Sequence, residues 1–459
     1  MKMFDLIVIG GGPGGYMAAE RAGHAGLSVL LIEKRALGGV CLNEGCIPSK
    51  TLLNSAKIFD YAQHGETYGV TAENAALDHK LVIQRKNKVV DTLVGGVKAL
   101  MKANKVTVVY GEAYIVDDTH VKVDDEIFGG SRLMIATGSE PVIPPIEGVA
   151  EGMENGFVLT SREILDLEEV PKSLVVVGGG VIGLEMASYY SIAGSKVTVI
   201  EMLPKIGGAI DDEISALLMK SYQKKGIEFV LGARVSAVTD VPGGTVLLCD
   251  PGCTGEPSPR AVPSDKVLLS VGRKPALDGF GLENTGVAVG RGAILTDLHC
   301  ITSKPNIYAV GDVNGKYMLA HAAYREAEVA VNHMLGKRDI MRYDAVPSVI
   351  YTSPEVACVG ETAGSAKARG VDCASVTVPM AYSGRYVAES ESADGVCKVV
   401  IDRKHNNIIG VHMIGSYVSE IIISACLMIE MQMRLEDVKE IIFPHPTVSE
   451  IIREAAFRF

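Results

Sequence analysis

The sequence carries, close to its start, Leu6-Ile-Val-Ile-Gly10-Gly-Gly-Pro-Gly-Gly15, in which an apolar run meets a glycine-rich turn before a helical stretch. This pattern of strand, G-x-G-x-x-G turn and helix predicts a βαβ unit that binds a dinucleotide. Gly10 would make the tight turn, Gly12 would let a pyrophosphate approach the backbone, and Gly15 would let the helix pack on the strand. The helix N-terminus would supply N–H groups for the anion.

The same pattern recurs later in the chain, where Leu174-Val-Val-Val177 leads into Gly178-Gly-Gly-Val-Ile-Gly183. Its glycines at the three fingerprint positions are Gly178, Gly180 and Gly183. In each copy an acidic residue, Glu33 or Glu201, follows the first glycine by twenty-three positions, close to the spacing of a carboxylate that binds an adenosine ribose. A single fingerprint could be only a structural turn, but two complete copies favour two dinucleotide sites. We therefore expect an electron relay with one resident and one exchanging cofactor.

The composition fits a large multidomain enzyme. With 459 residues, 47% hydrophobic and 22% charged, the chain falls outside the disordered, collagen-like and disulfide-scaffold classes. A net charge of -11 and the lack of a Lys/Arg-rich run argue against binding to nucleic acid or to an anionic membrane. The sequence shows no secretion signal and no uninterrupted apolar span, and its nine cysteines are mostly scattered. We expect a cytoplasmic protein.

The order of these segments predicts an α/β fold with two Rossmann-like dinucleotide-binding domains and a C-terminal α+β domain. The expected domains are residues 1–145 with the first fingerprint, 146–270 with the second, 271–342 as a central continuation of the first domain, and 343–459 as the α+β domain. A Pro/Gly-rich loop from Pro251 to Pro263 is a local elaboration without an assigned role. Cys249 lies just before that loop and Cys253 within it, and both are interpreted as incidental surface thiols.

A pair of cysteines lies in Gly39-Val-Cys41-Leu-Asn-Glu-Gly-Cys46-Ile-Pro-Ser-Lys50. On a straight helix, five residues rise about 7.5 Å, which exceeds the roughly 7 Å limit for the Cα atoms of a disulfide. The backbone must therefore bend for Cys41 and Cys46 to bridge, and Gly45 accepts such a bend. Cys46 would then lie near a helix N-terminus with Lys50 one turn on, and both features lower a thiol pKa. We interpret the pair as a redox couple; two unrelated buried thiols are the alternative, and no second pair completes a zinc site.

A histidine framed by prolines stands near the C-terminus, in Phe443-Pro-His445-Pro-Thr-Val-Ser-Glu450. Thr447 and Glu450 fit a capping box, in which case Glu450 only caps a helix and His445 is a turn residue. Alternatively, His445 is the base that a dithiol reaction needs, and Glu450 orients the imidazole and stabilises its charge. The residues alone leave both interpretations open.

Taken together, these segments resemble the pyridine nucleotide-disulfide oxidoreductases, over the full chain and in the same order. The residues that carry the resemblance are Gly10–Gly15, Gly39–Lys50, Gly178–Glu185, Ala309–Asp312 and His445–Glu450. The similarity is greatest to members that oxidise dihydrolipoamide. It implies FAD on the first fingerprint, NAD on the second, and a homodimer in which the C-terminal domain contributes His445 and Glu450 to the partner's disulfide. Residues 1–145 and 271–342 would thus form the FAD-binding domain, 146–270 the NAD-binding domain, and 343–459 the dimerisation domain. The expected partner is a lipoyl-bearing protein of a 2-oxo acid, acetoin or glycine-cleavage complex.

The resemblance also implies roles for individual residues. Cys41 would be the thiol that exchanges with the lipoyl group, and Cys46 the thiol that lies against the flavin. Lys50 would lie near the reactive nitrogen of the flavin, paired with Glu185. Further positions that line FAD in the family are matched here by Ala113, Ala136, Thr137, Gly138, Asp312, Met318, Leu319, Ala320 and His321. Val235 and Gly272 match positions that line NAD.

The implied activity is oxidation of dihydrolipoamide to lipoamide with reduction of NAD to NADH, through a Cys41–Cys46 disulfide. A carboxylate at Glu201 about 4 Å from a phosphate charge costs roughly 4 kcal/mol at an effective dielectric constant of about 20, which favours NAD over NADP and disfavours glutathione reductase-like members. The chain ends Ala-Phe-Arg-Phe459, without the vicinal cysteines of mercuric reductase-like members. Another NAD(P)H-dependent disulfide reductase and a non-catalytic flavoprotein subunit are the alternative functions.

Overall fold

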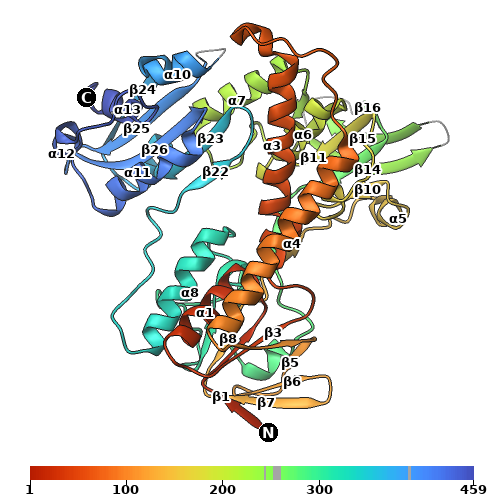
Figure 1. Cartoon of the computed structure of the whole chain (residues 1–459), viewed down its shortest axis with the longest axis vertical. Helices are drawn as coiled ribbons and strands as arrows, with labels where there is room; N and C mark the ends of the chain where they lie inside the picture. The colour runs from red at the N-terminus through yellow and green to blue at the C-terminus, as the bar shows by residue number, and fades with distance from the viewer. Residues whose placement is uncertain (242–243, 252–259, 391–393) are drawn as a thin grey trace. The chain divides into compact units, whose positions relative to one another are not determined.

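The computed structural model describes residues 1–241, 244–251, 260–390 and 394–459, and its contacts divide the chain into two compact units (Figure 1). The first unit contains Met1–Thr51, Leu81–Val142 and Gly272–Arg342. The second contains Leu52–Lys80, Ile143–Val271 and Tyr343–Phe459.

A five-stranded parallel sheet forms the centre of the first unit. Its strands, in spatial order, are β21 (Ile307–Ala309), β8 (Leu133–Ile135), β2 (Leu6–Ile9), β3 (Val29–Glu33) and β4 (Thr107–Tyr110). All of these strands except β4 are buried at every residue, as expected where both faces of a parallel sheet are covered. Helices α1 (Pro13–His24) and α8 (Ala320–Met334) pack side by side (Figure 1).

A second, four-stranded sheet completes the core of this unit. Its order is β1 (Lys2–Phe4), β7 (Glu126–Gly130), β6 (His120–Val123) and β5 (Ala113–Ile115). Phe4, Ile115, Val121 and Phe128 join the parallel strands in one hydrophobic cluster. The short elements β9 (Ser139–Pro141) and β18 (Arg273–Pro275) pair with each other, as do β19 (Val289–Gly290) and β20 (Ala293–Ile294).

The second unit begins with another parallel sheet, built from the second fingerprint. Its order is β10 (Val158–Leu159), β17 (Lys266–Leu269), β11 (Ser173–Val177), β12 (Lys196–Glu201) and β13 (Glu228–Leu231). The helices of this part are α5 (Val149–Glu154), α6 (Val181–Ala193) and α7 (Asp212–Lys224). An antiparallel sheet of β14 (Ala233–Val241), β15 (Gly244–Pro251) and β16 (Arg260–Ser264) adjoins it.

The expected Pro251–Pro263 loop overlaps this antiparallel sheet. Residues 252–259, including Cys253, lie outside the described residues, and so does the side chain of Cys249. Residues from Arg260 onward belong to β16 rather than to a loop.

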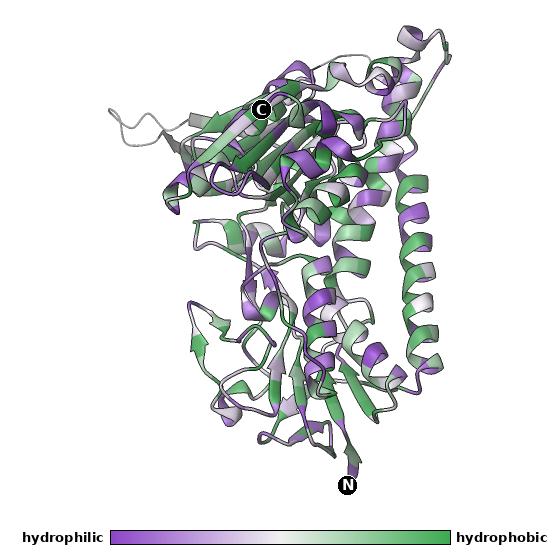
Figure 2. Cartoon of the chain, turned by 90° about the vertical axis from the view of Figure 1, so that its left-hand side faces the viewer, coloured by the Kyte–Doolittle hydropathy of each residue, from purple (hydrophilic) through white to green (hydrophobic). Residues whose placement is uncertain are grey.

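The C-terminal part of the second unit is an antiparallel sheet covered by helices. The strand order is β22 (Ser348–Ile350), β23 (Glu355–Gly360), β26 (Asn407–Gly415), β25 (Val396–Asp402) and β24 (Cys373–Pro379). Helices α11 (Val418–Glu430) and α13 (Glu450–Ala456) pack on one face around Val399, Val411 and Met413. Figure 2 shows the hydrophobic residues gathered along the strands, while the helices alternate between hydrophobic and hydrophilic residues. The remaining helices here are α9 (Ala363–Ala368), α10 (Gly384–Glu389) and α12 (Leu435–Glu440).

This architecture confirms the predicted fold class, because two parallel sheets each carry a fingerprint and an α+β part follows. Three α-helices lie between β3 and β4 in the chain: α2 (Gly39–Glu44), α3 (Cys46–Gln63) and α4 (His79–Ala103). Within the part of the chain that the structure describes, no helix combines the length and apolarity needed to cross a bilayer.

Candidate redox and dinucleotide sites

The first fingerprint forms a turn that only glycine can occupy at two of its positions. Gly10 has a φ of +102°, and a Cβ there would lie 2.3 Å from the carbonyl oxygen of Ala136. A Cβ on Gly15 would lie 1.8 Å from the carbonyl oxygen of Gly10. A Cβ on Gly12, in contrast, would have one described atom within 4 Å, the Cα of Gly39 at 3.8 Å. Gly12 therefore keeps the approach to the helix end open rather than relieving a clash within the turn.

The second fingerprint repeats this geometry. Gly178 has a φ of +105°, and a Cβ on Gly183 would lie 2.3 Å from the carbonyl oxygen of Gly178. A Cβ on Gly180 would meet no described atom within 4 Å. Gly12 and Gly180 are the N-caps of α1 and α6, with φ and ψ of -74° and -173° in the first and -77° and -179° in the second, and no described side chain caps either helix. Both helix ends thus offer backbone N–H groups to an anion, as a dinucleotide pyrophosphate requires.

The two acidic residues at the strand ends hold their fingerprint turns in the same way. Glu33 accepts the backbone N–H of Gly11 at 2.7 Å with one oxygen and that of Arg35 at 2.7 Å with the other. Glu201 accepts the N–H of Gly179 at 2.6 Å and that of Leu203 at 2.8 Å. Because a carboxylate has about four lone-pair sites, each group retains acceptor capacity for a ribose hydroxyl. The carboxylates therefore shape the turns at the positions where the sequence analysis expects a ribose contact.

The expected flavin-lining turn at Ala136–Gly138 lies against the first fingerprint. Thr137 donates its hydroxyl to the carbonyl oxygen of Ala276 at 2.8 Å, and Gly138 adopts a φ of +74°. Just after this turn, Ser139 donates to Oδ2 of Asp312. Burial raises the pKa of Asp312, against the opposing effect of its hydrogen bond with Ser139.

Two polar residues that the sequence analysis did not single out hold the segment of Asp312. Arg273 donates to Oγ of Ser139 at 2.8 Å and to its carbonyl oxygen at 2.7 Å. Glu326 is completely buried on α8 and accepts the N–H of Gly311 at 2.6 Å and the side-chain amide of Asn314 at 2.9 Å. An acid on the otherwise alanine-rich buried face of α8 is the sequence signal that could have identified Glu326.

The other residues expected near FAD take positions in the same unit. Ala113 begins β5, two residues after Gly111, whose N–H donates to the carbonyl oxygen of Glu33 at 3.0 Å. The segment 318–321 forms the start of α8, with Leu319 as its N-cap. The first unit thus contains the whole set expected to bind FAD: Gly10, Gly12, Gly15, Glu33, Lys50, Ala113, Ala136, Thr137, Gly138, Asp312, Met318, Leu319, Ala320 and His321.

The residues expected near NAD have more varied surroundings. The side chain of Val235 lies in the hydrophobic core of the second unit, so only its backbone could meet a nucleotide. Glu185 is buried on α6 and accepts the N–H of Tyr351 at 3.1 Å. Gly272 has a φ of +120° and belongs to the first unit. Ser270, which the sequence analysis missed, donates to the carbonyl oxygen of Gly178 at 2.9 Å and so supports the second fingerprint turn.

The two cysteines lie on either side of a helix break. Cys41 belongs to α2, whereas Cys46 is the first residue of α3. Gly45 separates the helices with φ of -153° and ψ of -110°, and a Cβ there would lie 2.9 Å from the carbonyl oxygen of Val40. The predicted bend at Gly45 is therefore present, and it brings the two thiols together.

Both cysteines are free thiols in this structure, and they interact strongly. A hydrogen bond with Cys46, followed by burial, raises the pKa of Cys41 far above its ordinary value. The protonation of Cys41 therefore depends on its contact with Cys46. Nearby, Tyr16 on α1 and Tyr324 on α8 join their hydroxyl oxygens at 2.6 Å, and burial raises the pKa of both phenols so that they remain neutral.

The C-terminal histidine and glutamate form a direct pair. Nδ1 of His445 lies 2.9 Å from Oε1 of Glu450, and the other carboxylate oxygen accepts the N–H of Thr447 at 2.9 Å. The hydroxyl of Thr447 donates to the carbonyl oxygen of Pro444 instead of capping α13, and the N-cap is Ser449. Of the two hydrogen bonds of the expected capping box, the one accepted by the Glu450 carboxylate is present, and the one accepted by the Thr447 hydroxyl is not. With 76% of its side chain exposed, His445 is free to reach another molecule.

Comparisons with known proteins agree with this geometry. Residues 4–327 match the family model of the pyridine nucleotide-disulphide oxidoreductases, and residues 346–456 match the dimerisation domain of the same family. The chain therefore belongs to the pyridine nucleotide-disulphide oxidoreductases, which confirms the resemblance seen in the sequence. The matched dimerisation domain supports a homodimer.

Particular members of the family lie close to this chain. Dihydrolipoyl dehydrogenases from Mycoplasma pneumoniae and Geobacillus stearothermophilus are each 39% identical over 457 residues, covering 98% of this chain and 97% and 95% of theirs. Among solved structures, LpdA from Mycobacterium tuberculosis matches with a TM-score of 0.90 and 25% identity over 100% of this chain and 99% of its own. The flavoprotein disulfide reductase RclA from Escherichia coli matches with a TM-score of 0.87 and 27% identity over both full chains.

Proposed function

We propose that this protein is a flavoenzyme that oxidises protein-bound dihydrolipoamide to lipoamide and reduces NAD to NADH. The observation that carries the proposal is the thiol pair of Cys41 and Cys46 across the Gly45 break, in the same unit as the first fingerprint. The relatives that are 39% identical over nearly the full chain, named dihydrolipoyl dehydrogenases, support the substrate.

The cofactors are FAD and NAD. When bound, FAD supplies two-electron transfer between the thiol pair and NAD. The set in the first unit suits FAD, with the pyrophosphate at the N-terminus of α1 and the flavin end near Asp312, Lys50 and the start of α8. The second fingerprint and Glu201 suit NAD. Lys205, in the loop after Glu201, donates to Asp212 at 2.5 Å and to the carbonyl oxygen of Ile210 at 2.8 Å, so its charge is engaged within the loop. This arrangement favours NAD over NADP.

The sulfur chemistry proceeds by thiol–disulfide exchange in the oxidised enzyme. One dihydrolipoyl thiolate attacks Sγ of Cys41, which breaks the Cys41–Cys46 bond, forms a mixed disulfide at Cys41 and leaves Cys46 as the thiolate. The second dihydrolipoyl sulfur then attacks the mixed disulfide, releasing lipoamide and the Cys41 thiol. The two electrons of the substrate now reside on the cysteine pair, and Cys46 would be the thiol that faces bound FAD.

His445 removes the proton from each attacking thiol, because only the thiolate is a competent nucleophile. It releases the first proton to solvent before the second attack, and it passes the second proton to the departing sulfur of Cys41, which leaves as a thiol. Glu450 orients the imidazole through its 2.9 Å contact and stabilises the imidazolium that forms. In the homodimer we assign this His445–Glu450 pair to the disulfide of the partner subunit. The exposed face of α11 that carries Ile423, Leu427 and Met431 provides the apolar surface for a second copy.

We assign residues 1–145 and 271–342 to the FAD-binding domain, 146–270 to the NAD-binding domain and 343–459 to the dimerisation domain. The macromolecular substrate is a lipoyl-bearing protein of a 2-oxo acid, acetoin or glycine-cleavage complex. The scattered cysteines favour a reducing compartment, and we place the enzyme in the cytoplasm.

A substrate panel tests the proposal. Lipoamide, oxidised glutathione, coenzyme A disulfide and oxidised thioredoxin are each offered with NADH and then with NADPH. The proposed function predicts turnover of lipoamide with NADH and little with the other combinations. Turnover of a different disulfide would indicate another disulfide reductase, and bound FAD without turnover of any substrate would indicate a non-catalytic flavoprotein.

A further inference from the structure

A row of polar side chains crosses the C-terminal sheet on the face opposite α11. The strand register aligns Ser348, Cys358, His412, Lys398 and Thr377 on five neighbouring strands. Burying such a row is costly unless its members are hydrogen-bonded or paired. The N-terminus of α7, which follows the second fingerprint in the chain, packs against this sheet and supplies the carboxylates.

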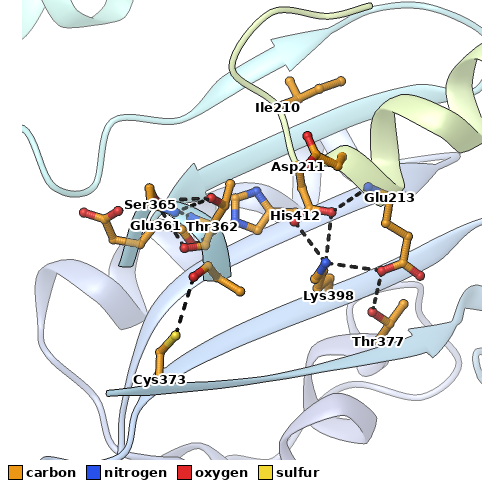
Figure 3. Close-up of polar contacts among 12 residues, drawn as sticks. Ile210, Asp211, Glu213, Glu361, Thr362, Ser365, Cys373, Thr377, Lys398 and His412 are labelled. Carbon is orange, nitrogen blue, oxygen red and sulfur yellow. Dashed lines mark hydrogen bonds and ion pairs between the residues drawn. The ribbon is translucent and has the colours of Figure 1, made fainter. Parts of the chain in front are cut away.

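Lys398 makes the central contact of the row. Its Nζ lies 3.0 Å from both carboxylate oxygens of Asp211 and 3.3 Å from Oε2 of Glu213, and Figure 3 shows its side chain directed toward these groups. Thr377 donates to the same oxygen of Glu213 at 3.0 Å. Burial opposes the charge on Lys398, but the hydrogen bond and charge of Asp211 raise its pKa, so the ammonium persists.

His412, which is paired with Lys398 on the adjacent strand, carries no positive charge that would compete for Asp211. His412 is only 2% exposed, and its Nε2 donates to the carbonyl oxygen of Glu361 at 2.9 Å. Among the described residues, its Nδ1 has no hydrogen-bond partner. Burial lowers the pKa of His412, which leaves the ring neutral. Lys398, and not His412, is therefore the cation of the row that pairs with Asp211.

Asp211 is the N-cap of α7 and ends the segment that starts at Glu201. Its Oδ1 accepts the N–H of Glu213 at 3.0 Å as well as the bond from Lys398. Lys398, on a strand of the C-terminal sheet, thus holds Asp211 at the end of segment 201–211. The segment begins at Glu201, the carboxylate expected to bind the ribose.

The segment between Glu201 and Asp211 also contacts the second fingerprint directly. The N–H of Gly207 donates to the carbonyl oxygen of Gly179 at 2.8 Å. Ile206 is fully buried, and its side chain lies 3.2 Å from where a Cβ on Gly179 would stand. A shift of this segment would therefore displace both the Gly178–Gly183 turn and Glu201. Lys398 opposes such a shift, because it holds the segment at Asp211.

We propose that Lys398 is a positioning residue for NAD: by holding Asp211 it fixes segment 201–211, and with it Glu201 and the Gly178–Gly183 turn, in the geometry that binds the nucleotide. This inference rests on the proposed function, in which that turn receives NAD. The C-terminal sheet then contributes to nucleotide affinity without touching the nucleotide.

The test compares four variants of the full-length, FAD-loaded dimer: Lys398→Met, Lys398→Arg, Asp211→Asn and the double variant Lys398→Met/Asp211→Asn. Lys224→Met is the matched control. Lys224 also lies on α7 and forms a 2.6 Å ion pair with Asp394, which precedes β25, but both members of this pair are exposed. Anaerobic flavin reduction is measured separately with NADH and with dihydrolipoamide.

Lys398→Met should raise the half-saturating NADH concentration roughly tenfold, because small displacements of positioning groups weaken binding strongly. Its reduction by dihydrolipoamide should stay within about twofold of the wild type, and Lys398→Arg should restore most of the NADH affinity. Asp211→Asn should resemble Lys398→Met, and their effects should not add in the double variant. Since Asp211→Asn keeps the helix cap nearly isosteric, it carries the test even where Lys398→Met fails to fold.

An unchanged half-saturating NADH concentration in both Lys398→Met and Asp211→Asn would overturn the role of Lys398, as would an equal loss of both half-reactions or an equal effect of Lys224→Met. A wild-type protein whose flavin is not reduced by NADH would instead overturn the proposed function itself. The two failures are thus distinguished within one experiment.

Discussion

Nδ1 of His445 lies 2.9 Å from Oε1 of Glu450, and this contact favours one of two interpretations of the C-terminal motif. A glutamate that only capped a helix would not need the imidazole, and the hydroxyl of Thr447 does not complete the capping box. The carboxylate instead has one oxygen on the ring and one on the N–H of Thr447. A base held by an orienting carboxylate is the arrangement that thiol activation requires.

Replacing His445 with Gln should therefore slow flavin reduction by dihydrolipoamide about 10²- to 10⁴-fold, the range expected for loss of a general base. Reduction of the same flavin by NADH should be unaffected, because that step uses no dithiol. Stopped-flow measurement of the two half-reactions checks both statements. An equal loss in both would make His445 a structural turn residue.

The pH dependence of the pair follows from Glu450. The hydrogen bond from the N–H of Thr447, and then the contact with His445, lower the pKa of Glu450 below its ordinary value. A carboxyl group with a lowered pKa is ionised at every pH above its ordinary pKa. It becomes protonated, and its contacts weaken, only as the pH falls through the lowered pKa. Glu450 should thus be ionised throughout the range from about pH 6 to pH 8, and Glu450→Gln should slow reduction by dihydrolipoamide at both ends of it. A Glu450→Gln variant that matched the wild-type rate at either pH would contradict an ionised Glu450 that supports the base.

The glycines of the second fingerprint should separate binding from folding. Gly180→Ala places a Cβ with no described neighbour within 4 Å, so the protein should fold normally but require roughly tenfold more NADH for half-saturation. Gly183→Ala places a Cβ 2.3 Å from the carbonyl oxygen of Gly178 and should lower the free energy of unfolding by about 1 to 3 kcal/mol. Thermal unfolding and NADH titration of both variants check the contrast. Normal NADH binding by a folded Gly180→Ala protein would argue against a nucleotide at this turn.

Glu326 should be important for both stability and flavin retention. Glu326→Ala leaves the N–H of Gly311 and the amide of Asn314 without this buried acceptor, which should cost about 2 to 4 kcal/mol in the free energy of unfolding. Because Gly311 precedes Asp312, the variant should also lose FAD more readily on dialysis. Glu326→Gln keeps an acceptor oxygen and serves as the control, with a smaller effect expected. Similar stability and FAD retention in wild type and Glu326→Ala would contradict this role.

The parts of the fold and site that the sequence predicts are those encoded by neighbouring residues. The fingerprint turns follow from glycine spacing after a β-branched run, and the bend between Cys41 and Cys46 follows from the reach of a disulfide and from Gly45. Contacts between residues distant in the chain could not be predicted in the same way. Ser139 and Arg273 meet across 134 residues, and Lys398 meets Asp211 across 187. Their partners become identifiable only when the strand order is known.

Cys41 and Cys46 should be indispensable in a way that other thiols are not. Cys41→Ser should abolish turnover of dihydrolipoamide while the protein still binds FAD, because serine cannot form the mixed disulfide. Cys373→Ser, which alters a buried thiol of the C-terminal sheet, should retain turnover and provides the control. Persistent turnover by Cys41→Ser would exclude the proposed exchange at this sulfur.

The visible absorption spectrum during anaerobic addition of dihydrolipoamide, and then of NAD, tests the electron path most directly. Purified wild-type protein should be yellow, its flavin band should change on addition of the dithiol, and NAD should restore the oxidised spectrum with formation of NADH. A protein that is colourless and remains so after incubation with FAD, or a flavin that does not respond to the dithiol, would contradict the account.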